Sequence, residues 1–345
     1  MAPELEETPV SYEELSDLEN EFDEVETEIS EFAPLRQSDN LGDKPLTSLR
    51  SPVRQQYALS KSLYVKRAAL VAKIPHFWPL VFEQAPMDID EYIQPSDSAV
   101  LLASLKSISV SRFELDEDEK NGDPRSVAIR FEFADNEHFE NKVLEKKFWW
   151  RQSTDGFAGL VSEPVEIKWK KGKDLTDGLL ALVKAVYDEQ VAKPKEPTPA
   201  KGTKKEKVPL TASQQALKDK MESTGMGGVS FFAWFGYVGE YVTAEESKIA
   251  VAKEKEERQK RKNGEEVKKD EDEEMGEDDD EEEDDEDDWE DDQEIFPTGD
   301  AIAMAIADDL WPGALKYFSE FTPFSLRGLG NLLLTHPQSK PRSRI

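Results

Sequence analysis

The first strong pattern of apolar positions lies in residues 11–33, where they recur at alternating steps of three and four. This heptad spacing is typical of a helix that packs against another helix. Ser11 and Glu14 have the spacing of a capping box at the start of that helix. The stripe is too narrow for a globular core face, which favours self-association over packing within the same chain. The predicted dimer seam, including later positions, is Leu15, Leu18, Phe22, Val25, Ile29, Phe32, Tyr57, Tyr64 and Val71.

A second helix is predicted from about Gln55 to Val71, where apolar side chains recur every seven residues. Residues 34–54 separate the two helices and are rich in Ser and Pro, so we expect them not to be helical. They number three heptads, and their removal would join the two helices in register. Two interpretations stay open: an insertion into one long helix, which includes an unspliced segment in the gene model, or a true loop between two helices.

Downstream of residue 75 the pattern changes to short strands separated by turn signals. Val127, Ile129, Phe131 and Phe133 alternate with polar residues, the period of a half-buried antiparallel strand. We predict strands at 107–114, 126–133, 146–151 and 164–170, and helices at 174–191 and through 311–318. A meander of about four antiparallel strands with surrounding helices makes the fold class α+β.

Charge changes this picture at residues 270–292, where 20 of 23 side chains are acidic. The whole chain of 345 residues carries a net charge of −31, so this tract supplies most of the excess. An apolar pattern resumes at Glu294, and the tract is therefore predicted to be a disordered loop inside the fold. Such a chain favours cationic partners and disfavours tight nucleic-acid binding and anionic membranes. A merely solubilising tract is the open alternative.

No residue pattern indicates catalysis or a cofactor. The chain has no cysteine, and its histidines, His76, His138 and His336, lack metal-ligand spacing. Neither a nucleophile elbow nor a phosphate-binding Gly-rich loop is present. We therefore expect no enzyme, no metal and no cofactor. The aromatic residues, including the run at 231–235, are predicted to be core, because base-stacking platforms need a positive groove. No apolar run reaches the roughly 18 residues that span a membrane.

Five motifs in order then resemble the nucleosome assembly protein family. The first two are the run Ala-Lys-Ile-Pro-His-Phe-Trp at 72–78 and the strand with its following segment at 131–144. The other three are Ile-Lys-Trp-Lys-Lys-Gly-Lys-Asp-Leu-Thr at 167–176, Ser-Phe-Phe-Ala-Trp-Phe at 230–235 and Asp-Asp-Leu-Trp-Pro at 308–312. The last two are similar to the SET (template-activating factor) branch. Two departures are the 34–54 insert and the position of the acidic tract, which in SET lies at the C-terminus.

The resemblance implies a homodimer joined by a long helix, with each protomer carrying an α+β "earmuff" domain that binds core histones. It implies a histone chaperone that assists nucleosome assembly or remodelling. The SET branch adds an alternative: a regulator that binds a histone acetyltransferase or inhibits a serine/threonine phosphatase. Basic runs at 201–207 and 258–262 are candidate import signals, so we expect a nuclear location, with shuttling to the cytoplasm as an open alternative.

These expectations define domain boundaries and binding residues. We predict a disordered 1–10, a dimerisation helix at 11–74 interrupted at 34–54, an earmuff at 75–244 and 294–320, a charged segment and acidic loop at 245–293, and a loose 321–345. Asp174, Asp308 and Asp309 are predicted as fixed histone-binding carboxylates, with helix capping or a helix-dipole role as the alternative. The mobile carboxylates are Glu277, Asp278, Asp279, Asp280, Glu281, Asp284 and Asp288.

Overall fold

The computed structural model describes residues 10–32, 47–154, 156–192, 210–224, 229–262 and 294–319. The chain divides into two compact units. Unit 1 comprises residues 1–110, 129–144 and 304–345, and unit 2 comprises 111–128 and 145–303. The predicted acidic loop at 270–292 lies outside the described residues, as do most of the predicted insert and the predicted loose ends.

The strands form a four-stranded sheet in the order β1 (Leu105–Ser111), β2 (Val127–Phe133), β3 (Val143–Gln152) and β4 (Ala158–Ser162). Strands β3 and β4 are antiparallel, with Phe148 opposite Ser162. The α+β class and the first three strands are confirmed. The fourth strand was predicted wrongly at 164–170: Pro164 has no N–H for a ladder, and the Val165 N–H donates instead to the Phe235 carbonyl at 2.8 Å.

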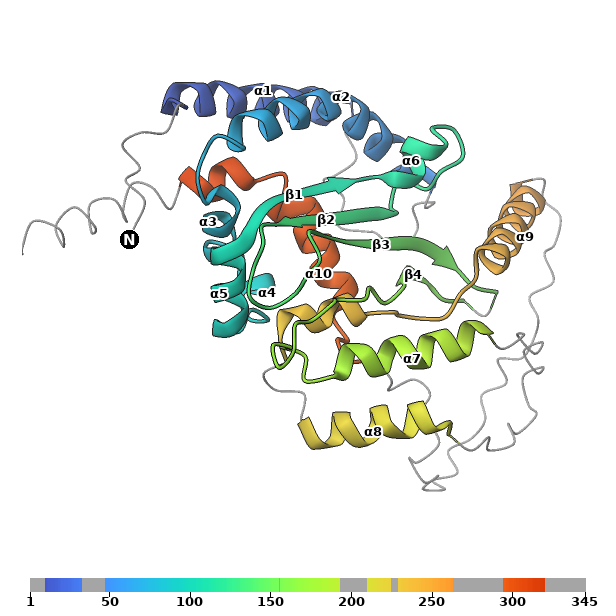
Figure 1. The fold of residues 1–345 in the computed structure, drawn as a ribbon. Helices are drawn as coiled ribbons and strands as arrows, with labels where there is room; N and C mark the ends of the chain where they lie inside the picture. Colours follow the sequence, from blue (N-terminus) through green and yellow to red (C-terminus); the bar gives the residue numbers. More distant parts are fainter. Residues whose placement is uncertain are drawn as a thin grey trace, which may run out of the picture. The chain divides into compact units, whose positions relative to one another are not determined.

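Unit 1 begins with two helices, α1 (Tyr12–Phe32) and α2 (Thr47–Val71), that lie side by side (Figure 1). The predicted capping box is present. The Ser11 N–H donates to the Glu14 carboxylate at 2.9 Å, and the Glu14 N–H donates to Ser11 Oγ at 3.2 Å. Helix α2 starts eight residues before the predicted Gln55, so the expectation that all of 34–54 is non-helical was wrong for residues 47–54.

The apolar stripe of α1 finds a partner within its own chain. Phe22 contacts Tyr64 with ring centroids 5.1 Å apart, and Lys66 pairs with Glu21 at 2.6 Å. Leu18 is buried to 6% exposure. Helix α2 thus packs against the α1 stripe within one chain, which is the alternative to self-association, and the dimer seam stays a prediction. Of the other seam positions, Val71 is buried, Leu15, Val25 and Tyr57 are half-buried, and the side chains of Ile29 and Phe32 lie outside the description.

Three shorter helices complete the N-terminal part of unit 1: α3 (Phe77–Glu83), α4 (Met87–Asp90) and α5 (Pro95–Ser104). Helices α3 and α5 pack against each other (Figure 1). The buried face of α3 consists of Phe77, Trp78, Pro79, Val81 and Phe82, and the ring centroids of Phe82 and Phe131 of β2 lie 6.4 Å apart. The Gln94 N–H donates to the Asp97 carboxylate at 3.0 Å, which fixes the start of α5.

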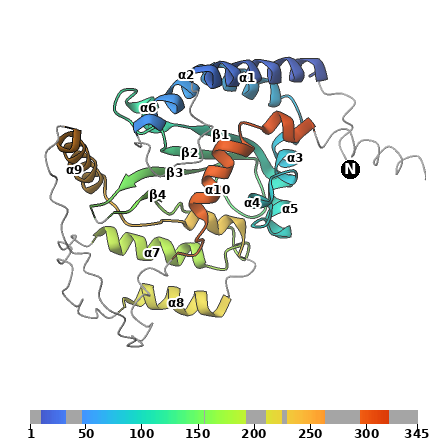
Figure 2. The same ribbon diagram turned by 180° about the vertical axis from the view of Figure 1, so that it is seen from behind.

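Unit 2 contains α6 (Phe113–Glu117), α7 (Leu179–Ala192), α8 (Ala212–Thr224), η3 (Phe231–Gly236), α9 (Ala244–Lys262) and α10 (Gly299–Ala305). Helices α7 and α8 lie side by side in both views (Figures 1 and 2). Helix α7 begins five residues after the predicted 174. The η3 turn is buried throughout, Trp234 lies 5.5 Å from Phe148, and its Nε1–H donates to the Gly299 carbonyl at 2.8 Å. The prediction that these aromatics are core is confirmed.

Candidate functional site

Asp308 and Asp309 lie in η4 (Ile306–Leu310), a π-helical turn of unit 1, and both are exposed. The Tyr317 hydroxyl donates to Asp309 Oδ1 at 3.0 Å. The turn depends on Gly313, because a Cβ there would lie 3.0 Å from the Asp309 carbonyl and 3.2 Å from the Tyr317 ring. The two predicted carboxylates thus reach solvent from a locally fixed turn. Since η4 continues α10 directly, the helix-dipole alternative applies only to the helical residues 314–319 that follow.

A buried arginine holds the chain just after these carboxylates. Arg67 of α2 is 2% exposed, and its Nη1 donates to the Trp311 carbonyl at 2.5 Å and the Pro312 carbonyl at 3.1 Å. The guanidinium lies 4.6 Å from the Trp311 ring and 4.9 Å from the Tyr64 ring. Burial lowers the pKa of Arg67 to about 10, so it remains a cation at neutral pH. Since Trp311 Nε1 also donates to the Ile108 carbonyl, residues 311–312 are fixed from two sides.

Asp174 is used inside the fold instead. It accepts hydrogen bonds from the Thr176 N–H at 2.8 Å, the Thr176 hydroxyl at 2.7 Å and the Gly178 N–H at 3.0 Å. This turn contains two left-handed residues, Asp177 with φ 50° and Gly178 with φ 87°, and it leads into α7. Asp177 also pairs with Lys220 of α8. These hydrogen bonds give Asp174 the structural role of the capping alternative, and its role in histone binding stays a prediction.

The predicted site residues do not all come together. Asp308 and Asp309 belong to unit 1 and Asp174 to unit 2. The mobile carboxylates lie outside the described residues: Glu277, Asp278, Asp279, Asp280, Glu281, Asp284 and Asp288. Asp308 and Asp309 are thus the predicted fixed carboxylates that the structure leaves exposed.

Glu294 is the first described residue after the acidic tract. Its role was not predicted from the sequence. Its carboxylate accepts from three backbone N–H groups, those of Val238 at 2.8 Å, Gly239 at 3.0 Å and Phe296 at 3.1 Å. Burial raises the pKa of Glu294, while these hydrogen bonds and Lys146 act to lower it. Glu294 therefore fixes the chain at the downstream end of the tract.

Lys146 of β3 is the cation that faces this anchor, and it is fully buried. Its Nζ donates to the carbonyls of Glu163 at 2.9 Å, Phe235 at 3.1 Å and Tyr237 at 2.8 Å. Burial lowers the pKa of Lys146 to about 7, against the opposing effects of Glu294 and Glu163. The sequence could have predicted the burial of Lys146, because the strand period places it on the same face as Leu144 and Phe148, which are both buried.

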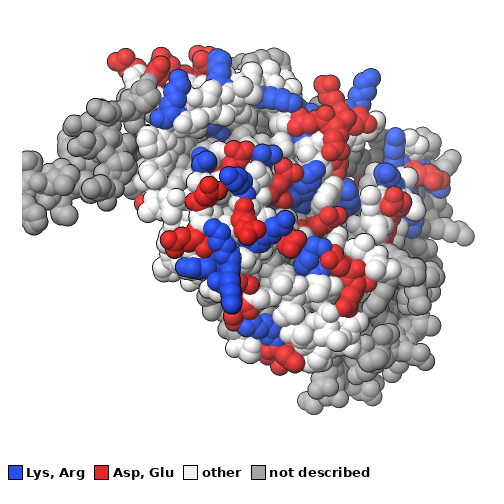
Figure 3. Space-filling view, in the orientation of Figure 1, with Lys and Arg blue, Asp and Glu red and all other residues white. Residues whose placement is uncertain are grey.

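The described surface offers neither a membrane span nor a metal site. Within these residues, no helix combines the length and apolar character that a bilayer crossing needs, and no group of carboxylates and histidines could hold a metal ion. Basic and acidic side chains are interspersed over the described part of the face in Figure 3. The described surface thus carries mixed charge, whereas the sequence concentrates acid at 270–292.

The described residues form an α+β fold with a four-stranded antiparallel sheet, in a chain whose sequence carries a strongly acidic tract at 270–292. A family model described as nucleosome assembly protein (NAP) matches residues 11–321, and the chain belongs to this family. This confirms the family that the five motifs predicted. The similarity to SET proteins described next agrees with the predicted branch.

Among curated proteins, the chain is 37% identical to Protein SET of Drosophila melanogaster over 131 residues, 37% of this chain and 45% of that protein. It is 32% identical to Protein SETSIP of Homo sapiens over 155 residues, 45% of this chain and 46% of that protein. The chain spans about half the length of the curated relatives it matches. Among solved structures, Ccp1 aligns with 23% identity and a TM-score of 0.42, covering 90% of this chain and 95% of that one.

Proposed function

We propose that this chain is a non-enzymatic histone chaperone that binds core histones and assists nucleosome assembly or remodelling in the nucleus, as a homodimer. The observation that carries the proposal is the family match over residues 11–321 in a chain whose acidic tract is flanked by folded residues on both sides. Helix α9 ends at Lys262 before the tract, and Glu294 is hydrogen-bonded into unit 2 after it. The tract is therefore tethered to the folded domain at both ends.

The mechanism follows from charge. Histones carry dense Lys and Arg side chains and bind DNA largely through counterion release. A polyacid competes for the same cations through many weak contacts that salt screens. Fixed carboxylates such as Asp308 and Asp309 add selectivity, because their geometry as well as their charge must match the partner. The protein would thus hold histones in a form that DNA can still take over.

Histone affinity across a salt series tests the proposal. The full chain is titrated with labelled H2A–H2B dimers and H3–H4 tetramers from about 0.15 to 0.6 M salt. Over this range the Debye length shortens, so attraction between charges is screened more strongly. The matched control keeps the length of the tract but replaces its 20 carboxylates at 270–292 by the corresponding amides. We expect tight binding by the native chain, and weaker binding with a shallower salt dependence by the amide variant.

Absence of histone affinity at the lowest salt would overturn the proposal. If that result came with inhibition of a histone acetyltransferase or a serine/threonine phosphatase, the regulatory alternative would replace it. The molar mass of the free protein in solution, measured by light scattering, tests the homodimer separately. A monomer at micromolar concentration would remove that part of the proposal, and the α1–α2 contact within one chain would then suffice to cover Leu18 and Phe22.

A further inference from the structure

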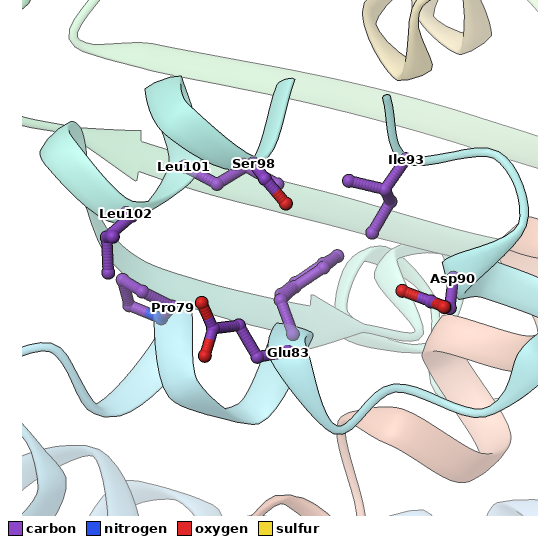
Figure 4. A pocket seen from close by; sticks show the side chains of 8 residues that line it. Pro79, Glu83, Asp90, Ile93, Ser98, Leu101 and Leu102 are labelled. Atoms are coloured by element: carbon purple, nitrogen blue, oxygen red, sulfur yellow. The ribbon is translucent and has the colours of Figure 1, made fainter. Parts of the chain in front are cut away.

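A small hollow in unit 1 lies between α3, α4 and α5, and no motif in the sequence pointed to it (Figure 4). Its volume is about 190 Å³. Drug-sized ligands and cofactors occupy pockets of roughly 300 to 1,000 Å³, so this hollow suits a single side chain better than a small molecule. The apolar part of its lining consists of Pro79, Phe82, Ile93, Leu101 and Leu102.

Ser98 and two carboxylates complete the lining of the hollow. Glu83 at the end of α3 and Asp90 at the end of α4 are both exposed, and Figure 4 shows them on different sides of the space. Neither carboxylate has a hydrogen-bond or ion-pair partner within the described residues. This differs from Asp97 on α5, which lines no part of the hollow and is buried as the acceptor of the Gln94 N–H. Glu83 and Asp90 are thus available to an incoming cation.

The surrounding chain strengthens the negative field. Residues 74–105 contain five acidic side chains and neither Lys nor Arg. On the described part of the face in Figure 3, by contrast, acidic and basic side chains are interspersed. These acidic side chains attract a basic partner to α3–α5, and the attraction weakens with salt.

We propose that this hollow receives a lysine side chain from an extended basic segment of a protein partner. The four-carbon stem of lysine covers apolar surface while its compact ammonium stays at the polar edge. Here the stem would lie on Leu101, Leu102 and Phe82, and the ammonium would reach Glu83 and Asp90. The inference rests on the proposed function for the source of that segment, because lysine-rich histone tails have this chemistry. It adds a side-chain-specific site to the general competition by the acidic tract.

The test uses the full chain with a reporter placed beside the hollow. The chain has no cysteine, so Met87→Cys, at a position 80% exposed on α4, can carry a single environment-sensitive fluorophore. The control reporter is Ile249→Cys, 63% exposed on α9 of unit 2. Both proteins are titrated with a synthetic peptide that alternates lysine and alanine, and with the same peptide carrying Nε-acetyl-lysine.

We expect the lysine peptide to change the reporter at position 87 saturably and the acetylated peptide to bind there at least tenfold more weakly. Acetylation removes the charge but keeps the stem. Glu83→Gln with Asp90→Asn should weaken the lysine response at position 87 about fivefold, since exposed ion pairs are individually modest. The position-249 response should not change. Both substituted side chains are exposed, and thermal unfolding checks that the variant is folded.

Three results would overturn the inference: a silent reporter at position 87, equal binding of the acetylated peptide, or unchanged affinity in the Glu83→Gln, Asp90→Asn variant. Tighter binding of an arginine–alanine peptide at position 87 would replace lysine by arginine as the occupant and so also reject the proposal as stated. Histone binding by the unlabelled chain is measured in parallel. If histones bind but the reporter is silent, only the lysine site fails; if histones do not bind at all, the proposed function fails.

Discussion

Each unit contains a buried cation that donates to main-chain carbonyls, and the two are held differently. Arg67 of unit 1 lies among aromatic rings and has no carboxylate partner in its hydrogen bonds. Lys146 of unit 2 donates to three carbonyls and faces Glu294, at the downstream end of the acidic tract. Arginine keeps its charge when buried, whereas buried lysine readily loses its proton. Unit 1 is thus fixed by a permanent charge and unit 2 by one that titrates near neutral pH.

Individual carboxylates also differ in whether they accept backbone hydrogen bonds or face solvent. In unit 2, Asp174 and Glu294 each satisfy backbone N–H groups and are used by the fold. In unit 1, Glu83, Asp90 and Asp309 remain exposed. A carboxylate that accepts several backbone hydrogen bonds stabilises structure, and one that faces water is available to a partner. Asp174 and Glu294 are thus used by the fold, whereas Glu83, Asp90 and Asp309 reach solvent.

The largest effect should come from Arg67→Met. It leaves the Trp311 and Pro312 carbonyls without their donor and removes the stacked guanidinium, so the free energy of unfolding should fall by about 3 kcal/mol. The matched control is Lys66→Met on the same helix, whose ion pair with Glu21 is exposed and should contribute less than about 0.5 kcal/mol. Chemical denaturation of both variants measures this, and equal losses would refute the role of Arg67.

The second effect is a pH dependence specific to Lys146. Its pKa is lowered from 10.5 to about 7 in the folded chain, so between these values the unfolded chain binds more protons. Stability should therefore rise with pH across this window, by at most about 1.4 kcal/mol per pH unit. Denaturation at about pH 7.5 and 9 should show this rise in the native chain and in Arg67→Met, but not in Lys146→Met. A rise that survives Lys146→Met would assign it to another group.

The third effect separates structural from binding carboxylates. Asp174→Ala removes the acceptor of three hydrogen bonds at the start of α7 and should lower the free energy of unfolding by about 1–2 kcal/mol. Asp174→Asn should lose less, because the amide oxygen still accepts. Histone affinity should stay within about twofold of the native value in both variants. A larger loss of affinity with intact stability would return Asp174 to the binding residues.

The smallest effect belongs to η4. Asp308→Asn with Asp309→Asn should change the free energy of unfolding by less than about 0.5 kcal/mol, because both side chains are exposed. Histone affinity should fall about two- to threefold, as expected for exposed charges at the edge of an interface. Titration with labelled histones measures the change. An unchanged affinity would reject a binding role and leave the helix-dipole role as the remaining interpretation.

Local patterns predicted the strands that carry a clear period of two and the helix starts that carry a capping signal. Buried and half-buried positions alternate over residues 129–133 of β2, and Ser11 with Glu14 forms the expected box. The fourth strand was misplaced because its sequence at 158–162 is short and contains Gly159, while 164–170 has the more strand-like composition. Strand β4 is defined by its pairing with β3, which sequence composition does not encode.

The site was harder to predict, because it depends on which side chains the fold leaves exposed to solvent. Asp174 has the same chemistry as Asp308, but backbone donors of its own turn satisfy it. Pro79 of α3 and Leu102 of α5 line the same hollow, and no rule of sequence spacing predicts that these two positions meet. A narrow stripe likewise predicts a partner helix but does not say whether that helix belongs to the same chain; in the structure Phe22 of α1 contacts Tyr64 of α2.

Nucleosome assembly on DNA tests the central claim most directly. Core histones and relaxed circular DNA are combined at physiological salt with the full chain, or with the variant whose 20 carboxylates at 270–292 are replaced by amides, and DNA supercoiling is measured. The account predicts supercoiling that depends on the native chain and falls strongly in the amide variant. A native chain that leaves the DNA relaxed, or an amide variant that is equally active, would contradict it.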